Sequence, residues 1–397
     1  MNSKQIIYLI FFLFLININI SAAQNNEYIL RVGLLRYYSS ITSISFSCSN
    51  DFALYNGESS DKISSYKKND NVTIFLKDNE LYYKDSKGIE NKSGVKLRIV
   101  PNNMNTITTI TSPNKPQKRY RGKFDITINN GKLRVVNIID LENYLCGVVP
   151  CEMPSHWHME ALKAQAVAAR TYAIRNKLKF SEYGYNVCDT VMSQVYKGVD
   201  SENSRTNQAV RETKGLVISY NGELARVYYS ADAGGMTQSF AEVFGDNIPY
   251  LQSVNNPNDK DIRLWSYSFS LSDLSKKLLD NKIAQISDIK EIKVSEMSKS
   301  GRVLKLDLIG ENEKAQISGE MLRKILGYSQ VKSTLFSLQI NDNGIVELNG
   351  KGYGHGIGMC QTGAETLAGP RYNYEFRQIL NHYFPKTDIK PLTSVKS

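Results

Sequence analysis

The stretch LCGVVPCEMPSHWHMEALKAQAVAARTYAI, residues Leu145–Ile174, decides how we expect the rest of the chain to fold. It begins as a short apolar strand, breaks at Pro150, presents Glu152, breaks again at Pro154 and continues as one long helix with Ser155 at its N-cap. Apolar residues recur at three- and four-residue steps along this helix, which is typical of an amphipathic helix packed closely against a neighbour. A carboxylate on a kinked turn is therefore predicted to precede a rigid rod.

Two cations share one face of the predicted helix. Lys163 and Arg170 are seven residues apart, which corresponds to two helical turns. An acid before a helix is usually stabilised by the helix dipole, and a basic residue on an amphipathic helix is usually solvated. The pattern alone therefore assigns no chemistry to Glu152 or to either cation.

Two motifs far downstream are rich in glycine. SADAGGMT, at 230–237, follows a predicted strand, and GYGHGIGMCQTGA occupies 352–364. Glycine at every second position from 350 to 358 does not suit a phosphate loop and predicts a strand with one face against another backbone or a ligand. His355 interrupts this run, and a lone histidine is more often a structural hydrogen-bonding group than a catalyst.

Four motifs in this order resemble the SpoIID/LytB family, the stage II sporulation protein D and amidase-enhancer group of bacterial cell-wall proteins. They are PCEMP at 150–154, EALKAQAVAARTYA at 160–173 and the two glycine-rich motifs, and the resemblance covers roughly residues 118 to 385. Family members typically have serine where this chain has Cys360 and an aromatic residue where it has Thr362, which weakens any transfer of roles to that loop.

The resemblance implies the activity of a peptidoglycan lytic transglycosylase. Ordinary glycosidases need two carboxylates, whereas a lytic transglycosylase can use one, first as acid and then as base. The family's catalytic glutamate matches Glu152. Its substrate-lining residues match Lys163, Arg170, Thr237 and Tyr250, and we add His355 as a further candidate for substrate binding.

One physical tension accompanies this assignment. A general acid must hold its proton near neutral pH, but a helix N-terminus and the cations at Lys163 and Arg170 would favour the charged form of Glu152. Burial would have to outweigh them, or the cations would have to point at the glycan.

Two other chemistries compete with glycan cleavage. Cys360 or Cys151 could act as a nucleophile with a histidine, but neither shows a third residue or a known peptidase signature. The set Cys146, Cys151, His156 and His158 has no standard zinc spacing. Some relatives hold zinc near the position of Cys188, but this chain lacks the adjacent His-Cys pair, so no metal and no cofactor are expected. A Cys146–Cys151 disulfide is possible, and the odd count of five cysteines leaves at least one thiol unpaired.

The ends and the charge of the chain indicate an exported protein. Residues 1–23 have the pattern of a secretory signal peptide, with an uncleaved membrane anchor as the alternative. The mature protein is therefore expected outside the cytoplasm, secreted or in the cell envelope, with membrane contact only if that segment is retained. The net charge of +10 over 397 residues suits a polyanionic wall, and the chain has no recognisable nucleic-acid module, so we expect no nucleic-acid partner.

We predict an α+β fold of mainly short antiparallel strands, with the long helix lining a cleft between lobes. The predicted domains are an all-β N-terminal module at 24–116, a SpoIID-like domain at 117–386 with an α+β lobe at about 255–340, and a C-terminal tail at 387–397. Within them, the sequence predicts a hairpin with a type I′ turn at Asn130-Gly131 and short helices at 271–279 and 318–326. The leading function is cleavage of peptidoglycan glycan strands. The alternative is a non-catalytic wall-binding protein that stimulates an N-acetylmuramoyl-L-alanine amidase, which would then be a partner.

Overall fold

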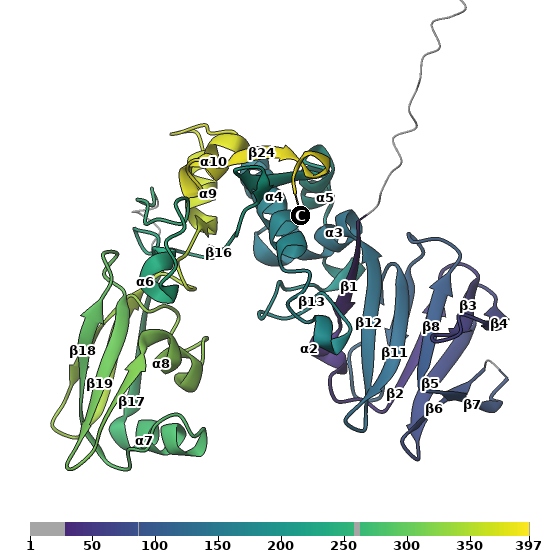
Figure 1. Ribbon diagram of the computed structural model, residues 1–397, viewed down its shortest axis with the longest axis horizontal. Helices are drawn as coiled ribbons and strands as arrows, with labels where there is room; N and C mark the ends of the chain where they lie inside the picture. The colour runs from purple at the N-terminus through teal and green to yellow at the C-terminus, as the bar shows by residue number, and fades with distance from the viewer. Residues whose placement is uncertain (1–27, 86, 258–262, 397) are drawn as a thin grey trace, which may run out of the picture.

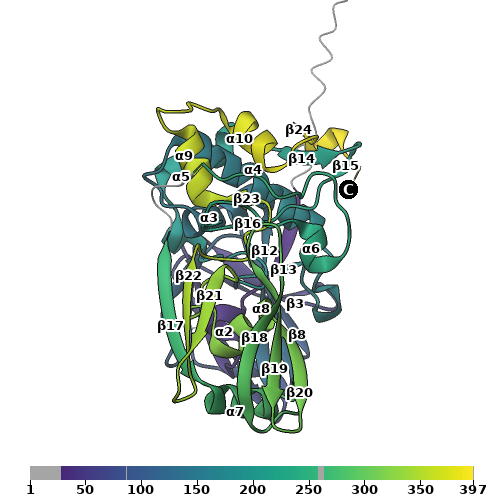
Figure 2. The same ribbon diagram turned by 90° about the vertical axis from the view of Figure 1, so that its left-hand side faces the viewer.

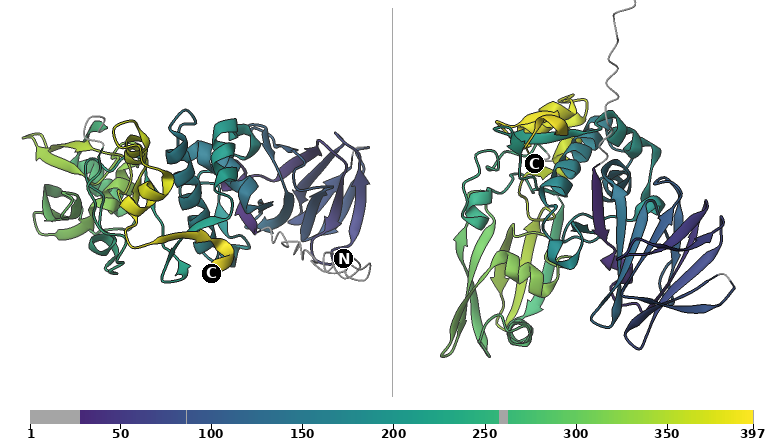
Figure 3. Two further views of the ribbon diagram at one scale, coloured as in Figure 1. Left: turned by 90° about the horizontal axis from the view of Figure 1, so that it is seen from above. Right: turned by 45° about the vertical axis from the view of Figure 1, so that its right-hand side comes forward.

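The computed structural model describes residues 28–85, 87–257 and 263–396. The predicted signal peptide lies outside these residues. The fold is a mixed α+β structure with a β-sandwich at one end, a helical middle part and a second α+β lobe at the other end (Figure 1). Figure 3 shows the same succession from above. Among the described residues, none of the helices has the length and apolar character needed to cross a membrane.

The β-sandwich consists of two sheets that share one core. Phe46 in one sheet and Phe124 in the other lie with ring centroids 5.4 Å apart, and both side chains are buried. The first sheet has the order β13 (Val187–Cys188), β1 (Ile29–Gly33), β12 (Lys132–Asp140), β11 (Lys123–Asn129), β8 (Lys96–Pro101), β3 (Phe52–Asn56) and β4 (Lys62–Tyr66). The second has the order β10 (Lys118–Tyr120), β9 (Thr108–Thr111), β2 (Ser43–Cys48), β5 (Asn71–Lys77), β6 (Glu80–Lys84) and β7 (Glu90–Gly94).

The first sheet crosses the domain boundary that the sequence suggested at residue 116. Strand β1 pairs with β12, and β8 pairs with β11, so strands from both sides of the boundary are hydrogen-bonded to each other in one sheet. The hairpin of β11 and β12 turns at Asn130 and Gly131, whose φ angles of 49° and 69° suit the predicted type I′ turn. The described residues before this boundary are therefore part of a larger folded unit.

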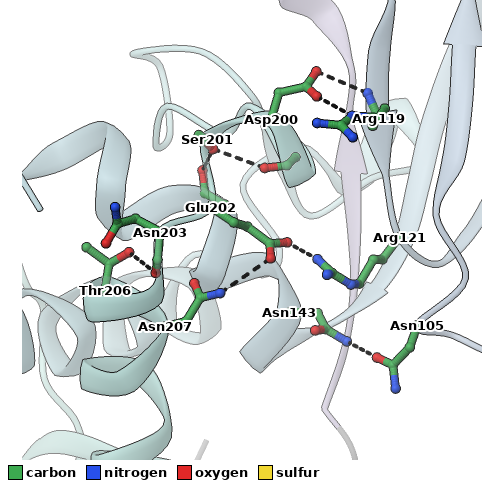
Figure 4. A network of polar contacts seen from close by, with 12 residues as sticks. Asn105, Arg119, Arg121, Asn143, Asp200, Ser201, Glu202, Asn203, Thr206 and Asn207 are labelled. Atoms are coloured by element: carbon green, nitrogen blue, oxygen red, sulfur yellow. Dashed lines mark hydrogen bonds and ion pairs between the residues drawn. The ribbon is translucent and has the colours of Figure 1, made fainter.

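Polar contacts join the sandwich to the helical part (Figure 4). The Arg119 guanidinium donates to Asp200 over 2.7 Å, Arg121 forms an ion pair with Glu202, and the Asn143 amide donates to Asn105 over 2.9 Å. These contacts connect β10 and its surroundings to the helices that follow β12.

Helix α3 (Leu141–Glu152) replaces the strand predicted before Pro150. Asp140 caps it by accepting from the backbone N–H of Asn143. Leu141, Leu145 and Val148 are buried and repeat at helical spacing, and this period overrides the local β-propensity of the valines. Pro150 is tolerated in the last turn of the helix.

The long predicted helix is α4 (Met159–Arg175), which starts three residues later than expected, after His158 instead of Ser155. Twelve of its 17 residues are buried, so most of its surface packs against protein instead of facing a groove. Its neighbours are α3, α5 (Ser204–Glu212), α9 (Gln361–Ala368), α10 (Phe376–Tyr383) and β14 (Leu216–Tyr220).

The second lobe has two three-stranded sheets, seen in Figure 2. The helices predicted at 271–279 and 318–326 are confirmed as α7 (Leu271–Asp280) and α8 (Gly319–Leu326). The sheets have the orders β17 (Leu264–Ser270), β22 (Ile345–Lys351), β21 (Phe336–Ile340), and β18 (Ile289–Met297), β19 (Val303–Gly310), β20 (Lys314–Ser318).

Short elements complete the fold between the lobes and at the C-terminus. The predicted tail contains β24 (Asp388–Pro391), which pairs with β14 beside β15 (Glu223–Leu224), so it belongs to a sheet. Strand β16 (Tyr229–Ser230) runs parallel to β23 (Met359–Cys360). Among the described residues, the remaining short α-helices are α2 (Leu35–Tyr38) and α6 (Phe240–Phe244), and 3-10 helices cover Ser181–Tyr183, Gly198–Ser201 and Leu392–Ser394.

Candidate active site

Glu152 is the last residue of α3, and its carboxylate is held from two other elements. One oxygen accepts from the backbone N–H of Val195 over 3.3 Å, and the other accepts from the Gln361 side chain over 3.4 Å. Val195 lies in the loop after β13, and Gln361 is the first residue of α9. Both contacts are long, so they orient the carboxyl without binding it tightly.

Buried amides and phenols form the next layer around Glu152. Gln361 also donates to Gln165 of α4 over 3.2 Å. Gln194, beside Val195, donates to the hydroxyl of Tyr229 over 2.7 Å and accepts from that of Tyr144 over 3.3 Å. Desolvation and, to a smaller extent, the charge of Glu152 raise the pKa of these two tyrosines well above its ordinary value, so both hydroxyls keep their protons.

This environment explains how Glu152 can hold a proton near neutral pH. Burial raises the pKa of Glu152 to about 7, and the hydrogen bonds from Val195 and Gln361 oppose this shift only in part. Near neutral pH the carboxyl therefore exists in both protonation states, as a group that must first donate and then accept a proton requires.

The two predicted substrate-binding cations make contacts within the protein. Lys163 bonds Glu160 over 2.8 Å and Glu212 over 2.7 Å, with its side chain 17% exposed. Arg170 is fully buried and forms a bidentate pair with Glu142 over 2.9 and 2.7 Å. Arg170 therefore does not face a glycan in this structure. Its guanidinium donates to the Glu142 carboxylate of α3 and to the backbone carbonyl oxygens of Leu216 and Val210.

Thr237 and Tyr250 are also engaged inside the protein. The Thr237 hydroxyl accepts from the backbone N–H of Val254 over 2.8 Å and is buried. The Tyr250 hydroxyl accepts from the backbone N–H of Arg226 over 2.9 Å, and its side chain is buried too. In this structure each hydroxyl oxygen accepts from a backbone N–H near α6, and the assignment of both residues to substrate binding stays a prediction.

His355 lies apart from this cluster. Its Nδ1 accepts from the backbone N–H of Ile357 over 3.0 Å, and burial lowers its pKa to about 4. The ring is therefore neutral near pH 7 and lines a separate pocket. Cys360, its proposed nucleophile partner, instead accepts from the N–H groups of Ala233 and Gly363 and caps α9, and burial raises its pKa.

Gly350 lies in β22, but from Gly352 to Gly358 the glycine run forms a loop instead of the predicted strand. Gly352, Gly354, Gly356 and Gly358 all have positive φ, a region that favours glycine. The expected close approach of backbone is confirmed, since a Cβ on Gly358 would lie 2.2 Å from the carbonyl oxygen of Tyr228. The glycines at every second position therefore correctly indicated a closely packed backbone. Their positive φ angles, however, are incompatible with a regular strand.

The proposed metal ligands do not converge. Among the described residues, no group of three or more His, Cys, Asp and Glu side chains could hold a metal ion. His158 instead contacts Glu365 of α9 over 2.8 Å, and Cys146 and Cys151 are both free thiols on α3.

Sequence reasoning missed the residues that surround Glu152. Gln165, Gln194 and Gln361 were not singled out, although Gln165 lies among alanines on a buried face of α4. A polar residue at such a position needs a hydrogen-bonding partner, and this was the available signal.

Comparisons with known proteins find similar sequences over much of the chain. The family model for SpoIID, stage II sporulation protein, matches residues 129–220, and a domain of unknown function, DUF8618, matches 237–358. An uncharacterised protein of Brachyspira hyodysenteriae is 36% identical over 272 residues, covering 68% of this chain and 72% of that protein. An amidase enhancer of Bacillus subtilis is 32% identical over 345 residues, covering 75% of this chain but 47% of the relative. A stage II sporulation protein D of Bacillus amyloliquefaciens is 31% identical over 279 residues, covering 66% of this chain and 77% of the relative. The chain belongs to the SpoIID family.

Proposed function

We propose that this protein acts in the cell wall as a peptidoglycan lytic transglycosylase. The observation that supports this most is one half-buried carboxyl, Glu152, whose pKa burial raises to about 7 beside neutral amides and phenols. Its hydrogen-bonding network among the described residues contains no second carboxylate, so a one-carboxylate mechanism suits it better than a two-carboxylate one.

The proposed reaction involves two proton transfers at Glu152, which first donates its own proton and then accepts another. Protonated Glu152 donates to the oxygen of the bond between N-acetylmuramic acid and N-acetylglucosamine, and this bond breaks at the muramic acid C1. The resulting carboxylate takes the proton of the C6 hydroxyl, whose oxygen forms the new bond to C1 and closes a 1,6-anhydro ring. Glu152 ends protonated, and no water is consumed.

An amidase-enhancer function is the second candidate. The Bacillus subtilis relative named amidase enhancer supports it, because it covers more of this chain than the other relatives described above. In this case the protein would bind glycan strands outside the cytoplasm and stimulate an amidase, and Glu152 would act in binding instead of in chemistry.

A pair of assays on purified protein separates the two functions. Glu152→Gln keeps the shape of the side chain but loses the transferable proton, so formation of anhydro-muramyl ends on isolated glycan strands should fall by roughly two to four orders of magnitude. Glu182→Gln, at an exposed carboxylate of residues 181–183, is the matched control and should leave the rate unchanged.

The second assay measures amidase stimulation on the same wall material. A folded Glu152→Gln variant that forms anhydro ends at the wild-type rate would contradict the catalytic assignment. If neither protein forms anhydro ends but both stimulate the amidase, the enhancer function replaces the transglycosylase.

A further inference from the structure

A pocket of about 540 Å³ lies between α6 and the second lobe, where the family comparison names no function. Figure 1 shows α6 next to the end of the lobe that contains β18 and β19. Its volume is in the range of pockets that hold small ligands. Tyr228, Phe244 and Ile357 give it a largely apolar wall.

This pocket is separate from the surroundings of Glu152. Tyr228 lines the pocket and packs against Phe240 and His355, with ring centroids 5.5 and 6.1 Å away. The next residue, Tyr229, points to Gln194 in the network around Glu152. Successive side chains near β16 therefore face opposite sides, as strand geometry requires.

The apolar wall is open to solvent. Phe244 is 57% exposed and Val243 is 42% exposed, although both line the pocket. Apolar side chains that line a concave surface and face water gain free energy when a ligand covers them.

One carboxylate in the pocket is held in place without a counter-charge. Glu242 accepts from the Gln238 side chain and from the backbone N–H of Lys299, each over 2.8 Å. Gln238 is itself buried and fixed, since its Oε1 accepts from the hydroxyls of Ser298 and Ser300. Each carboxylate oxygen can accept a further hydrogen bond, so Glu242 retains capacity toward the pocket.

The other charges near the pocket largely cancel. Glu296 pairs with Lys305 over 2.5 Å, and Glu320 pairs with Arg323 over 2.9 Å. Across the part of the chain that the structure describes, Glu242 forms no ion pair, and His355 is neutral near pH 7. Glu242 is therefore the carboxylate of the pocket lining without a paired cation, and the buried Arg302 guanidinium, whose charge acts on His355, donates to the carbonyl oxygen of Ala233.

We propose that this pocket binds a peptide through the ammonium group of a lysine-type side chain. The ammonium would donate to the fixed carboxylate of Glu242, and the methylenes would cover Phe244 and Val243. A charge-assisted hydrogen bond supplies the specificity, and the aliphatic stem buries apolar surface. An anionic ligand is disfavoured because it would lie against an uncompensated carboxylate.

The test uses the full-length chain and two dipeptide probes, acetyl-Leu-Lys-amide and the same peptide acetylated at the lysine Nε. Binding is measured by calorimetry or by NMR titration. The free-amine peptide should bind at least about tenfold more tightly than the acetylated one, since acetylation converts the ammonium into a neutral amide and so removes the charge-assisted contact. Equal affinity for the two peptides, or no binding of either, would overturn the proposal without any mutation.

Variants locate the binding. Glu242→Gln should abolish the preference for the free amine, and Phe244→Ala should weaken both peptides to a similar extent. Glu182→Gln is again the control and should bind as the wild type does. A folded Glu242→Gln variant that keeps the preference for the free amine would assign the binding to another site. If Glu242→Gln fails to fold, Phe244→Ala still gives an independent result. None of these measurements depends on Glu152, so their outcome is independent of the proposed activity.

Discussion

Glu152 shows how burial can determine the chemistry of a single carboxyl. Its raised pKa of about 7 predicts that kcat/KM is nearly constant at lower pH and falls about tenfold per pH unit above 7, because the free enzyme then lacks the proton to donate. A pH–rate profile on glycan strands checks this. A rate that instead rises from pH 6 to 8 would mean that the essential form is the carboxylate.

The same shift predicts a stability effect with a definite sign. The folded-state pKa lies above the usual 4.5, so the native protein binds this proton more tightly than the unfolded chain and loses stability as pH rises from about 4.5 to 7. Glu152→Gln removes this loss, so its Tm relative to the wild type should increase over that range. Thermal unfolding of both proteins at pH 5 and pH 8 measures the difference, and a pH-independent difference would contradict the burial of this carboxyl.

The contacts of Arg170 predict an effect on stability instead of the substrate contact that the resemblance implied. It is fully buried against Glu142, so Arg170→Ala leaves an unpaired carboxylate and should lower the free energy of unfolding by about 3 kcal/mol. Lys163→Ala, the matched variant on the same face of α4, should cost about 1 kcal/mol or less. Urea unfolding compares them. A fully stable Arg170→Ala protein with weaker glycan binding in a Glu152→Gln background would restore the role of Arg170 in substrate binding.

At the scale of elements, the turn between α3 and α4 is held from both sides. Arg205 of α5 donates to the carbonyl oxygens of Ser155 and Trp157, each over 2.9 Å. On the other side, His158 contacts Glu365 of α9, the helix that also provides Gln361. This turn follows Glu152 directly, so these contacts position the carboxyl relative to α9.

Arg205→Ala should therefore reduce kcat by several-fold to about tenfold, because small displacements of a reacting group are costly. Its pH–rate profile should also shift, since a less buried Glu152 has a lower pKa and the fall in rate should begin at lower pH. Arg211→Ala, at an exposed position of the same helix, is the control. A reduced kcat with an unshifted profile would indicate general destabilisation instead of loss of positioning.

The sequence predicted individual elements better than their surroundings. Helices α7 and α8 and the hairpin at Asn130 were predictable because their signals, a capping residue or a turn dipeptide, are local. Helix α3 was missed because Pro150 and the valines suggested a strand. Its buried apolar residues pack against the sandwich, and this packing stabilises the helix. The partners of Arg170 and Glu152 lie 28 and 209 residues away along the chain, a distance over which spacing carries no information.

At the scale of the whole molecule, the β-sandwich is a structural support for the site. Val195, one of the two residues that donate to Glu152, follows β13, and β13 pairs with β1, which comes from the N-terminal segment. The sheet therefore connects the start of the described chain to the loop of Gln194 and Val195. An independent N-terminal module would have lacked this connection.

Removing residues 24–116 tests this arrangement. The deletion takes away β1 and β8, which pair with β12 and β11, and it exposes the apolar face that the second sheet covers. Unpaired strand edges and an uncovered core should leave the remaining chain insoluble or unfolded. The mature chain from residue 24 is the control, and solubility, circular dichroism and thermal unfolding are the measurements. A soluble fragment with a cooperative unfolding transition would show that 117–397 folds alone. The interstrand pairs across residue 116 would then be dispensable for the fold and for the loop that contacts Glu152.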